Sequence, residues 1–174
     1  DFPIVEPSSR GPALATLPGH IAIGHTRYST AGESTVANAQ PLLIDCVHGQ
    51  VGICHNGNIV NAREIRDELV RQGSIFQTNS DTEVALHLFA RSQAPAIDDA
   101  IVESVARLTG AFSFAFVTKD RLVAVRDPHG FRPLALGRLG DAWVVCSETC
   151  AMDLVGATYL RDVEPGEVLI LGPG

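Results

Sequence analysis

The chain changes its hydrophobic period twice, and this order of periods constrains the fold more than any other feature. Between residues 61 and 108, apolar residues recur every three to four positions in three segments. On either side they alternate with a period of two, as in "AFSFAFV" at residues 111–117 and "RLVAVRD" at residues 121–127. Strands, then helices, then strands predict a layered α+β domain, in which helices cover the outer faces of two antiparallel sheets.

Individual elements follow from these patterns and from turn residues. We expect a strand at residues 20–27, a hairpin over residues 42–57 that turns at His48-Gly49-Gln50, helices at residues 61–72, 80–92, 98–108 and 148–156, an antiparallel meander with strands at residues 111–117, 121–127, 133–137 and 142–147, and a closing strand at residues 167–171. The first two helices open with capping-box patterns, Asn61 to Glu64 and Ser80 to Glu83. Four of the ten prolines fall in the first 19 residues, so residues 1–16 read as an irregular lead-in to one domain over residues 17–174.

Composition narrows the class of partner. The net charge is -7, from 13 basic and 20 acidic residues without a basic cluster, which argues against nucleic acid or an anionic membrane and favours a small polar ligand. No apolar run approaches the roughly 20 residues of a membrane span, and the start has no secretory layout, so we expect a soluble cytoplasmic protein with no membrane partner.

The cysteines and histidines do not predict a metal site. The four cysteines have no Cys-x-x-Cys spacing, and His25, Cys46, Cys54 and His55 do not have the spacing of a closed metal site. We therefore expect reduced thiols, mostly buried, and no metal in this domain.

The pair Asn56-Gly57 is the first candidate for chemistry. An Asn-Gly pair usually marks a hairpin turn, but a helix rather than a strand follows it here. Placed where the chain leaves the sheet, the pair would offer a carboxamide N–H and a backbone N–H, which suit the oxyanion of a tetrahedral intermediate. The alternative is a strand-to-helix turn in which both residues merely tolerate a positive φ.

Two charged residues form a second candidate group. Arg27, at the end of the first expected strand, offers a planar guanidinium to a carboxylate, with Thr30 nearby. Asp81, in the first turn of the second helix, could receive an ammonium group. Together they would hold both ends of an amino-acid zwitterion. The alternatives are a solvated arginine, an ordinary loop threonine and a plain helix cap.

Six ordered motifs between residues 17 and 171 resemble known enzymes. "GHTRYSTAG", "HNGNIVNA" and "SDTEVALHL" resemble the glutaminase domain of the class II glutamine amidotransferases, which have the four-layer αββα sandwich of the N-terminal-nucleophile hydrolases. "AVRDPHGFRPLALG", "VVCSETCAMDLVGA" and "LRDVEPGEVLIL" are more selective and resemble the amidophosphoribosyltransferase family of purine biosynthesis. The resemblance implies that glutamine is hydrolysed and that its ammonia passes to a phosphoribosyltransferase domain.

The resemblance also implies roles for the candidate residues. It places Arg27 and Thr30 at the glutamine carboxylate, Asn56 and Gly57 in the oxyanion hole, and Asp81 at the α-amino group. The family's nucleophile is a cysteine at the mature N-terminus, whose own α-amino group can act as the base.

The first residue departs from this pattern. Because this sequence begins with Asp1, we expect a piece of a longer enzyme, without its nucleophile, its first strands and its phosphoribosyltransferase domain, and inactive by itself. Cys54 is the tempting substitute nucleophile, but we expect it to pack inside. An exposed sheet edge would then favour self-association of the piece.

Cofactors and rival functions follow from the same resemblance. It implies no cofactor in this domain, Mg²⁺ and in some members a [4Fe–4S] cluster elsewhere in the intact enzyme, and a homo-oligomer. One rival is the glutaminase domain of another class II enzyme, such as glucosamine-6-phosphate synthase. The other is a catalytically inactive homologue that binds glutamine.

Overall fold

The computed structural model describes residues 19–26 and 38–172, and its elements form two antiparallel sheets with helices on their outer faces. In chain order the elements are β1 (Leu42–Cys46), β2 (Gly49–Ile59), α2 (Ala62–Arg71), α3 (Thr82–Arg91), α4 (Ile97–Ala106), β3 (Gly110–Val117), β4 (Leu122–Arg126), β5 (Ala135–Leu139), β6 (Ala142–Cys146), α5 (Thr149–Val155), β7 (Thr158–Asp162) and β8 (Val168–Leu171).

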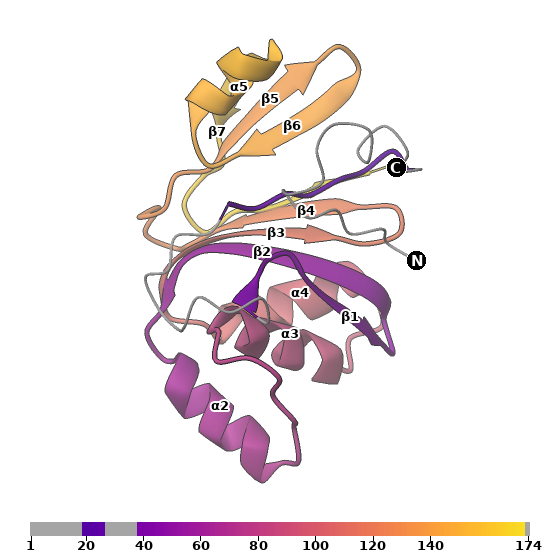
Figure 1. The fold of residues 1–174 in the computed structure, drawn as a ribbon, viewed down its shortest axis with the longest axis vertical. Coiled ribbons are helices and arrows are strands. Elements are labelled where there is room, and N and C mark those ends of the chain that lie inside the picture. The colour runs from indigo at the N-terminus through magenta and orange to yellow at the C-terminus, as the bar shows by residue number, and fades with distance from the viewer. Residues whose placement is uncertain (1–18, 27–37, 173–174) are drawn as a thin grey trace.

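The elements stack in four layers. The larger sheet has the strand order β1-β2-β3-β4-β8, and the smaller sheet has the order β6-β5-β7. Helices α3 and α4 lie below the larger sheet in Figure 1, and α5 lies above the smaller one. The predicted α+β class with αββα layering is therefore confirmed.

The main core lies between the larger sheet and its helices. Phe112, Phe114 and Phe116 occupy alternate positions of β3, are each at most 2% exposed, and pack in one cluster with Phe89 of α3 and Ile101 of α4. Burying a side chain of this size stabilises the fold by about 1.5–3 kcal/mol. A smaller cluster that includes Ala124, Leu134 and Val163 joins β4 to the region of the smaller sheet. These packed layers fix the strands and loops that carry the candidate site.

The strand predicted at residues 20–27 is wrong for its described part. Residues 20–26 join neither sheet, although their exposure alternates along the segment. Ile23 points toward the larger sheet, where its side chain approaches Gly52 of β2. A period of two reports an extended segment with one covered face, and it does not require backbone pairing.

The predicted meander is divided between the two sheets. β3 pairs with β4 and β5 pairs with β6, but β4 pairs with β8 rather than with β5. The loop after Arg126 therefore crosses from one sheet to the other. β7, which pairs with β5, was not predicted, because four of its five residues are exposed and its sequence lacks a period-two apolar pattern.

The helices are confirmed, but neither of the two predicted capping boxes is complete. Ser80 Oγ accepts a hydrogen bond from the Thr82 N–H at 3.3 Å, but the Ser80 N–H donates to Thr78 Oγ1 at 3.1 Å rather than to Glu83. Asn61 makes no cap hydrogen bond; its carboxamide accepts from Thr109 N and donates to Arg107 O, both at 2.9 Å. Glu83 accepts the N–H groups of Gln77 and Thr78, both at 2.8 Å. Both side chains are used for contacts with neighbouring segments instead of the first helical turn.

The first hairpin is confirmed, with its turn at Val47-His48, one residue before the predicted position, because Cys46 pairs with Gly49.

Among the described residues, no helix combines the length and the apolar character that crossing a membrane requires.

Candidate functional site

A cavity of about 780 Å³ brings most of the candidate residues together. Its walls come from the second half of β2, the residues just before α3, the loop that crosses between the sheets and the segment after β6, together with residues 24–26, Gln40 and the start of β3. They include His55, Asn56, Gly57, Asp81, Arg132 and Glu148. Arg27 and Thr30 lie outside the described residues.

Asn56 and Gly57 lie within β2 rather than at its tip, which corrects the sequence prediction. Asn56 pairs with Ser113 and Gly57 with Phe112, and the ladder continues to Ile59. The strand remains paired through the Asn-Gly dipeptide because Gly57 adopts a φ of +138°. A side chain there would collide with the Ala111 carbonyl and lie 2.9 Å from Phe112 Cα, so the position requires glycine.

The backbone N–H of Gly57 points to the edge of β2 that faces the cavity. Backbone N–H groups of an extended strand alternate between its two edges. The His55 N–H donates to Gln40 Oε1 at 2.6 Å, and the Ile59 N–H donates to Asp81 Oδ2 at 2.9 Å, both away from β3. The Val60 N–H points the other way, to Thr109 O at 2.8 Å. Gly57 lies between His55 and Ile59, so alternation directs its N–H to the same edge of β2 as theirs, away from β3.

The Asn56 carboxamide is held by an arginine from the crossing loop. Arg132 Nη2 donates to Asn56 Oδ1 at 2.8 Å, and both residues line the cavity. Because the oxygen of the carboxamide is engaged, its N–H₂ group is the edge left to donate to a ligand. Arg132 belongs to the stretch "RDPHGFRPL", and no local pattern marks it as a site residue.

Asp81 bonds to strand β2 instead of capping its helix. Its side chain makes no cap hydrogen bond; Oδ2 accepts from Ile59 N, and Oδ1 lies 3.5 Å from Nδ1 of His55. Burial acts to raise the pKa of Asp81, but hydrogen bonding from His55 and from the Ile59 N–H together lower it below its usual value. The carboxylate is therefore anionic at neutral pH, and it can bind a cation in the cavity.

His55 holds Asp81 and the start of α3 in register with β2. Its ring stacks on Phe114 with centroids 4.7 Å apart, and Nδ1 lies 3.1 Å from Thr82 Oγ1. The side chain is buried. In the sequence, His55 is noticeable only because it directly precedes Asn56. Its contacts with distant residues could not be predicted from that position.

Cys54, two residues before Asn56, is not an activated thiol. It is buried, as predicted, and burial raises its pKa to about 12, so it is protonated at neutral pH. The prediction that most of the thiols are buried is wrong, because Cys46 and Cys146 are half-buried and Cys150 is exposed. Among the described residues, we find no group of three or more histidine, cysteine, aspartate or glutamate side chains placed to hold a metal ion.

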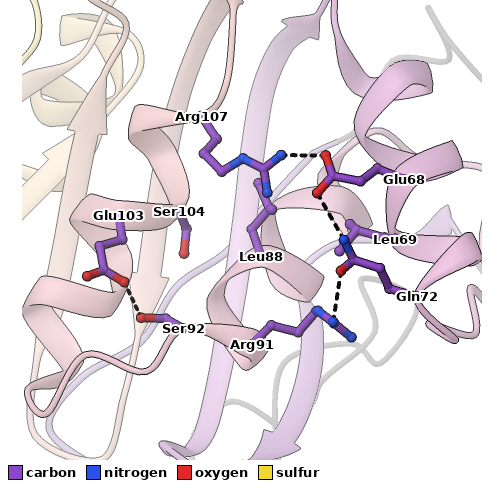
Figure 2. A pocket seen from close by; sticks show the side chains of 9 residues that line it. All are labelled: Glu68, Leu69, Gln72, Leu88, Arg91, Ser92, Glu103, Ser104 and Arg107. Atoms are coloured by element: carbon purple, nitrogen blue, oxygen red, sulfur yellow. Dashed lines mark hydrogen bonds and ion pairs between the residues drawn. The ribbon is translucent and has the colours of Figure 1, made fainter.

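A second cavity, of about 340 Å³, lies between α2, α3 and α4 and is a weaker candidate. Figure 2 shows that its polar side chains bind one another: Arg107 pairs with Glu68, and Gln72 bridges Glu68 and Arg91. Polar groups that satisfy each other leave little to recognise a ligand. The cavity at the end of β2, with an anionic carboxylate and directed N–H donors, is the better site.

Known proteins resemble this chain in sequence. Residues 25–153 match the model of the glutamine amidotransferase domain family. The chain is 57% identical over 159 residues to the chloroplastic amidophosphoribosyltransferase 2 of Arabidopsis thaliana, covering 91% of this chain and 28% of that protein. It is 51% identical to the amidophosphoribosyltransferase of Bacillus subtilis, again covering 91% of this chain and 33% of that protein.

A solved structure agrees with both the fold and the sequence matches. The glutamine phosphoribosylpyrophosphate amidotransferase of Bacillus subtilis, complexed with ADP and GMP, superposes with a TM-score of 0.80 at 50% identity, covering 85% of this chain and 32% of that one. The chain thus spans about a third of the length of these relatives. The family model covers well over half of the residues and the fold agrees with it, so the chain belongs to the glutamine amidotransferase domain family.

Proposed function

We propose that this chain is the glutaminase domain of an amidophosphoribosyltransferase, which hydrolyses glutamine to supply ammonia for phosphoribosylamine formation. The observation that carries the proposal is the convergence of Asn56, Gly57 and Asp81 on one cavity. They supply a carboxamide donor, an outward N–H and an anionic carboxylate, which are the groups that binding and hydrolysing an amino-acid amide require.

Each end of the substrate has a partner in this proposal. The Asp81 carboxylate binds the α-ammonium group of glutamine, and Arg27 and Thr30 bind its carboxylate. The side-chain amide then reaches toward Asn56 and Gly57. A charge-assisted contact of the Asp81 kind contributes roughly 1.5–3 kcal/mol when it is desolvated.

The chemistry is acyl transfer to a thiol. The N-terminal cysteine implied by the family attacks the amide carbon, and the carbonyl oxygen becomes an oxyanion that accepts the N–H groups of Asn56 and Gly57. The C–N bond breaks as the nitrogen takes a proton and leaves as ammonia, which gives a thioester. Water then hydrolyses the thioester to glutamate and regenerates the thiol. Because the pKa of Cys54 is raised to about 12, Cys54 does not take the role of the N-terminal thiol.

The whole enzyme would deliver the ammonia to its own phosphoribosyltransferase domain. The curated relatives named amidophosphoribosyltransferase favour this acceptor over the one used by glucosamine-6-phosphate synthase. Mg²⁺, a [4Fe–4S] cluster outside this domain, homo-oligomeric assembly and a cytoplasmic location stay predictions.

Removing the Asn56 carboxamide tests the proposal. In the intact protein that carries this chain, we expect Asn56→Ala to lower kcat for glutamate release by about 10²–10³, with little change in KM, because one oxyanion donor is lost. Synthesis from added ammonia should continue at its original rate. Asn61→Ala is the control, since it also removes a carboxamide, but at the start of α2, where the group binds only backbone. Equal effects of the two changes on kcat would refute the oxyanion role.

A further inference from the structure

We propose that Arg132 is a positioning residue that fixes which edge of the Asn56 carboxamide faces the substrate. This inference rests on the proposed function and assigns a role to the motif "RDPHGFRPL", at residues 126–134. An asparagine side chain can turn over and exchange its oxygen with its nitrogen. In the wrong orientation the oxygen would face the developing oxyanion and repel it.

The contact with Arg132 selects one orientation. Arg132 Nη2 lies 2.8 Å from Asn56 Oδ1. A guanidinium has donors and no acceptor, so it binds the oxygen edge of a carboxamide and disfavours the N–H₂ edge. The N–H₂ group is thereby turned to the other side, where it can donate to the substrate oxygen.

The loop that carries Arg132 is itself held in place. The buried Asp127 carboxylate accepts the N–H groups of His129, Phe131 and Arg132 at 3.0, 3.1 and 3.0 Å. Arg126 donates from Nε to Arg132 O at 2.8 Å and from Nη2 to Gly130 O at 3.1 Å. Arg132 is thus anchored through its own N–H and C=O, so its side chain extends to Asn56 from a fixed backbone.

The charge of Arg132 adds to its orienting effect. In the described part of the chain, no carboxylate forms an ion pair with this guanidinium, and its Nε is buried without a hydrogen-bond partner. A positive charge that is not neutralised polarises the carboxamide to which it is bonded and makes the N–H₂ group a stronger donor. Arg132 acts through Asn56, and we assign it no direct contact with glutamine.

Replacing the guanidinium tests this role in the intact protein that carries this chain. We expect Arg132→Leu to lower kcat for glutamine hydrolysis by about 10- to 100-fold with KM nearly unchanged, because the oxyanion donor is no longer oriented. Arg132→Lys should recover part of the rate, since an ammonium also donates to Oδ1, and it serves as the folded variant if the leucine form is unstable. Ammonia-dependent synthesis should be unchanged in both. Arg138→Leu, which removes an arginine stacked on Trp143, is the control.

The double variant distinguishes positioning from direct binding. If Arg132 acts through Asn56, then Asn56→Ala combined with Arg132→Leu should be no slower than Asn56→Ala alone. Multiplied losses, or a raised KM with unchanged kcat, would overturn the inference, since either result shows that Arg132 contacts the substrate independently. A slow Asn56→Ala enzyme beside a full-rate Arg132→Leu enzyme would refute this inference alone. A full-rate Asn56→Ala enzyme would refute the proposed function as well.

Discussion

The substitution Asp81→Asn separates two roles of this side chain: its negative charge and its hydrogen bond to β2. Asp81 Oδ2 accepts the Ile59 N–H at 2.9 Å, and the carbonyl oxygen of an asparagine can accept the same bond. The side chain is 18% exposed, so most of its interaction with a ligand takes place away from bulk water. The substitution therefore removes the negative charge while it leaves the strand-to-helix contact in place.

The expected effect falls on KM for glutamine. A charge-assisted hydrogen bond to the α-ammonium group contributes roughly 1.5–3 kcal/mol, which corresponds to an increase in KM of about 10- to 150-fold. kcat should change little, because Asp81 lies at the end of the substrate that does not react. The assay measures glutamate release at saturating and limiting glutamine, and ammonia-dependent synthesis reports that the rest of the intact protein is unaffected.

Glutaramate, which is glutamine without its α-amino group, supplies the matched control. The wild-type protein should bind glutaramate more weakly than glutamine by a similar factor, and Asp81→Asn should not weaken glutaramate binding further. Loss of affinity for both compounds alike would show that the carboxylate only supports the fold. An unchanged KM for glutamine would show that the Asp81 charge does not bind the substrate.

Two further predictions concern stability. Gly57→Ala should lower the free energy of unfolding, measured in urea, by roughly 2–6 kcal/mol, because it adds a collision with Ala111 to a strained φ. Gly49→Ala is the control and should lower it less, because Gly49 has a φ of +90° but open space around it. Equal losses in the two variants would show that the collision has no effect. Asp127→Asn should lower the free energy of unfolding by about 1–3 kcal/mol, because the new NH₂ group cannot accept a hydrogen bond from the buried backbone N–H that it faces. Burial acts to raise the pKa of Asp127, but the N–H groups of Arg132, Phe131 and His129 together lower it, so its stabilisation is present above the unfolded pKa of about 3.9 and is lost as pH falls through the folded pKa. The Tm difference between wild type and Asp127→Asn should therefore shrink below about pH 4, and a difference that grew there would contradict this sign.

The sequence predicted the layers well because periodicity reports which face of an element is covered. It located the three central helices and the paired strands β2 to β4 without any contact information. It missed β7, whose exposed residues carry no such pattern. It also treated the turn after β4 as part of one meander, because a local turn signal does not say to which sheet the chain returns.

Three of the candidate residues, Asn56, Gly57 and Asp81, line one cavity, but their contacts could not be predicted from the sequence. Asn56-Gly57 reads locally as a turn, and only its pairing with β3 keeps it inside a strand. Arg132 meets Asn56 across 76 residues of sequence, a contact that no local pattern encodes. Asn61 matched a capping rule, but a longer-range contact with Thr109 took precedence over local capping.

A crystal structure of the intact protein, trapped with a glutamine analogue that alkylates its nucleophile, would show whether Asn56 and Gly57 bind the substrate oxygen. We expect the carbonyl oxygen of the analogue to lie about 2.7–3.1 Å from both Asn56 Nδ2 and Gly57 N, with its α-ammonium group against Asp81. An analogue bound in the cavity between α2, α3 and α4, or one whose carbonyl oxygen faces away from Asn56 and Gly57, would contradict this expectation.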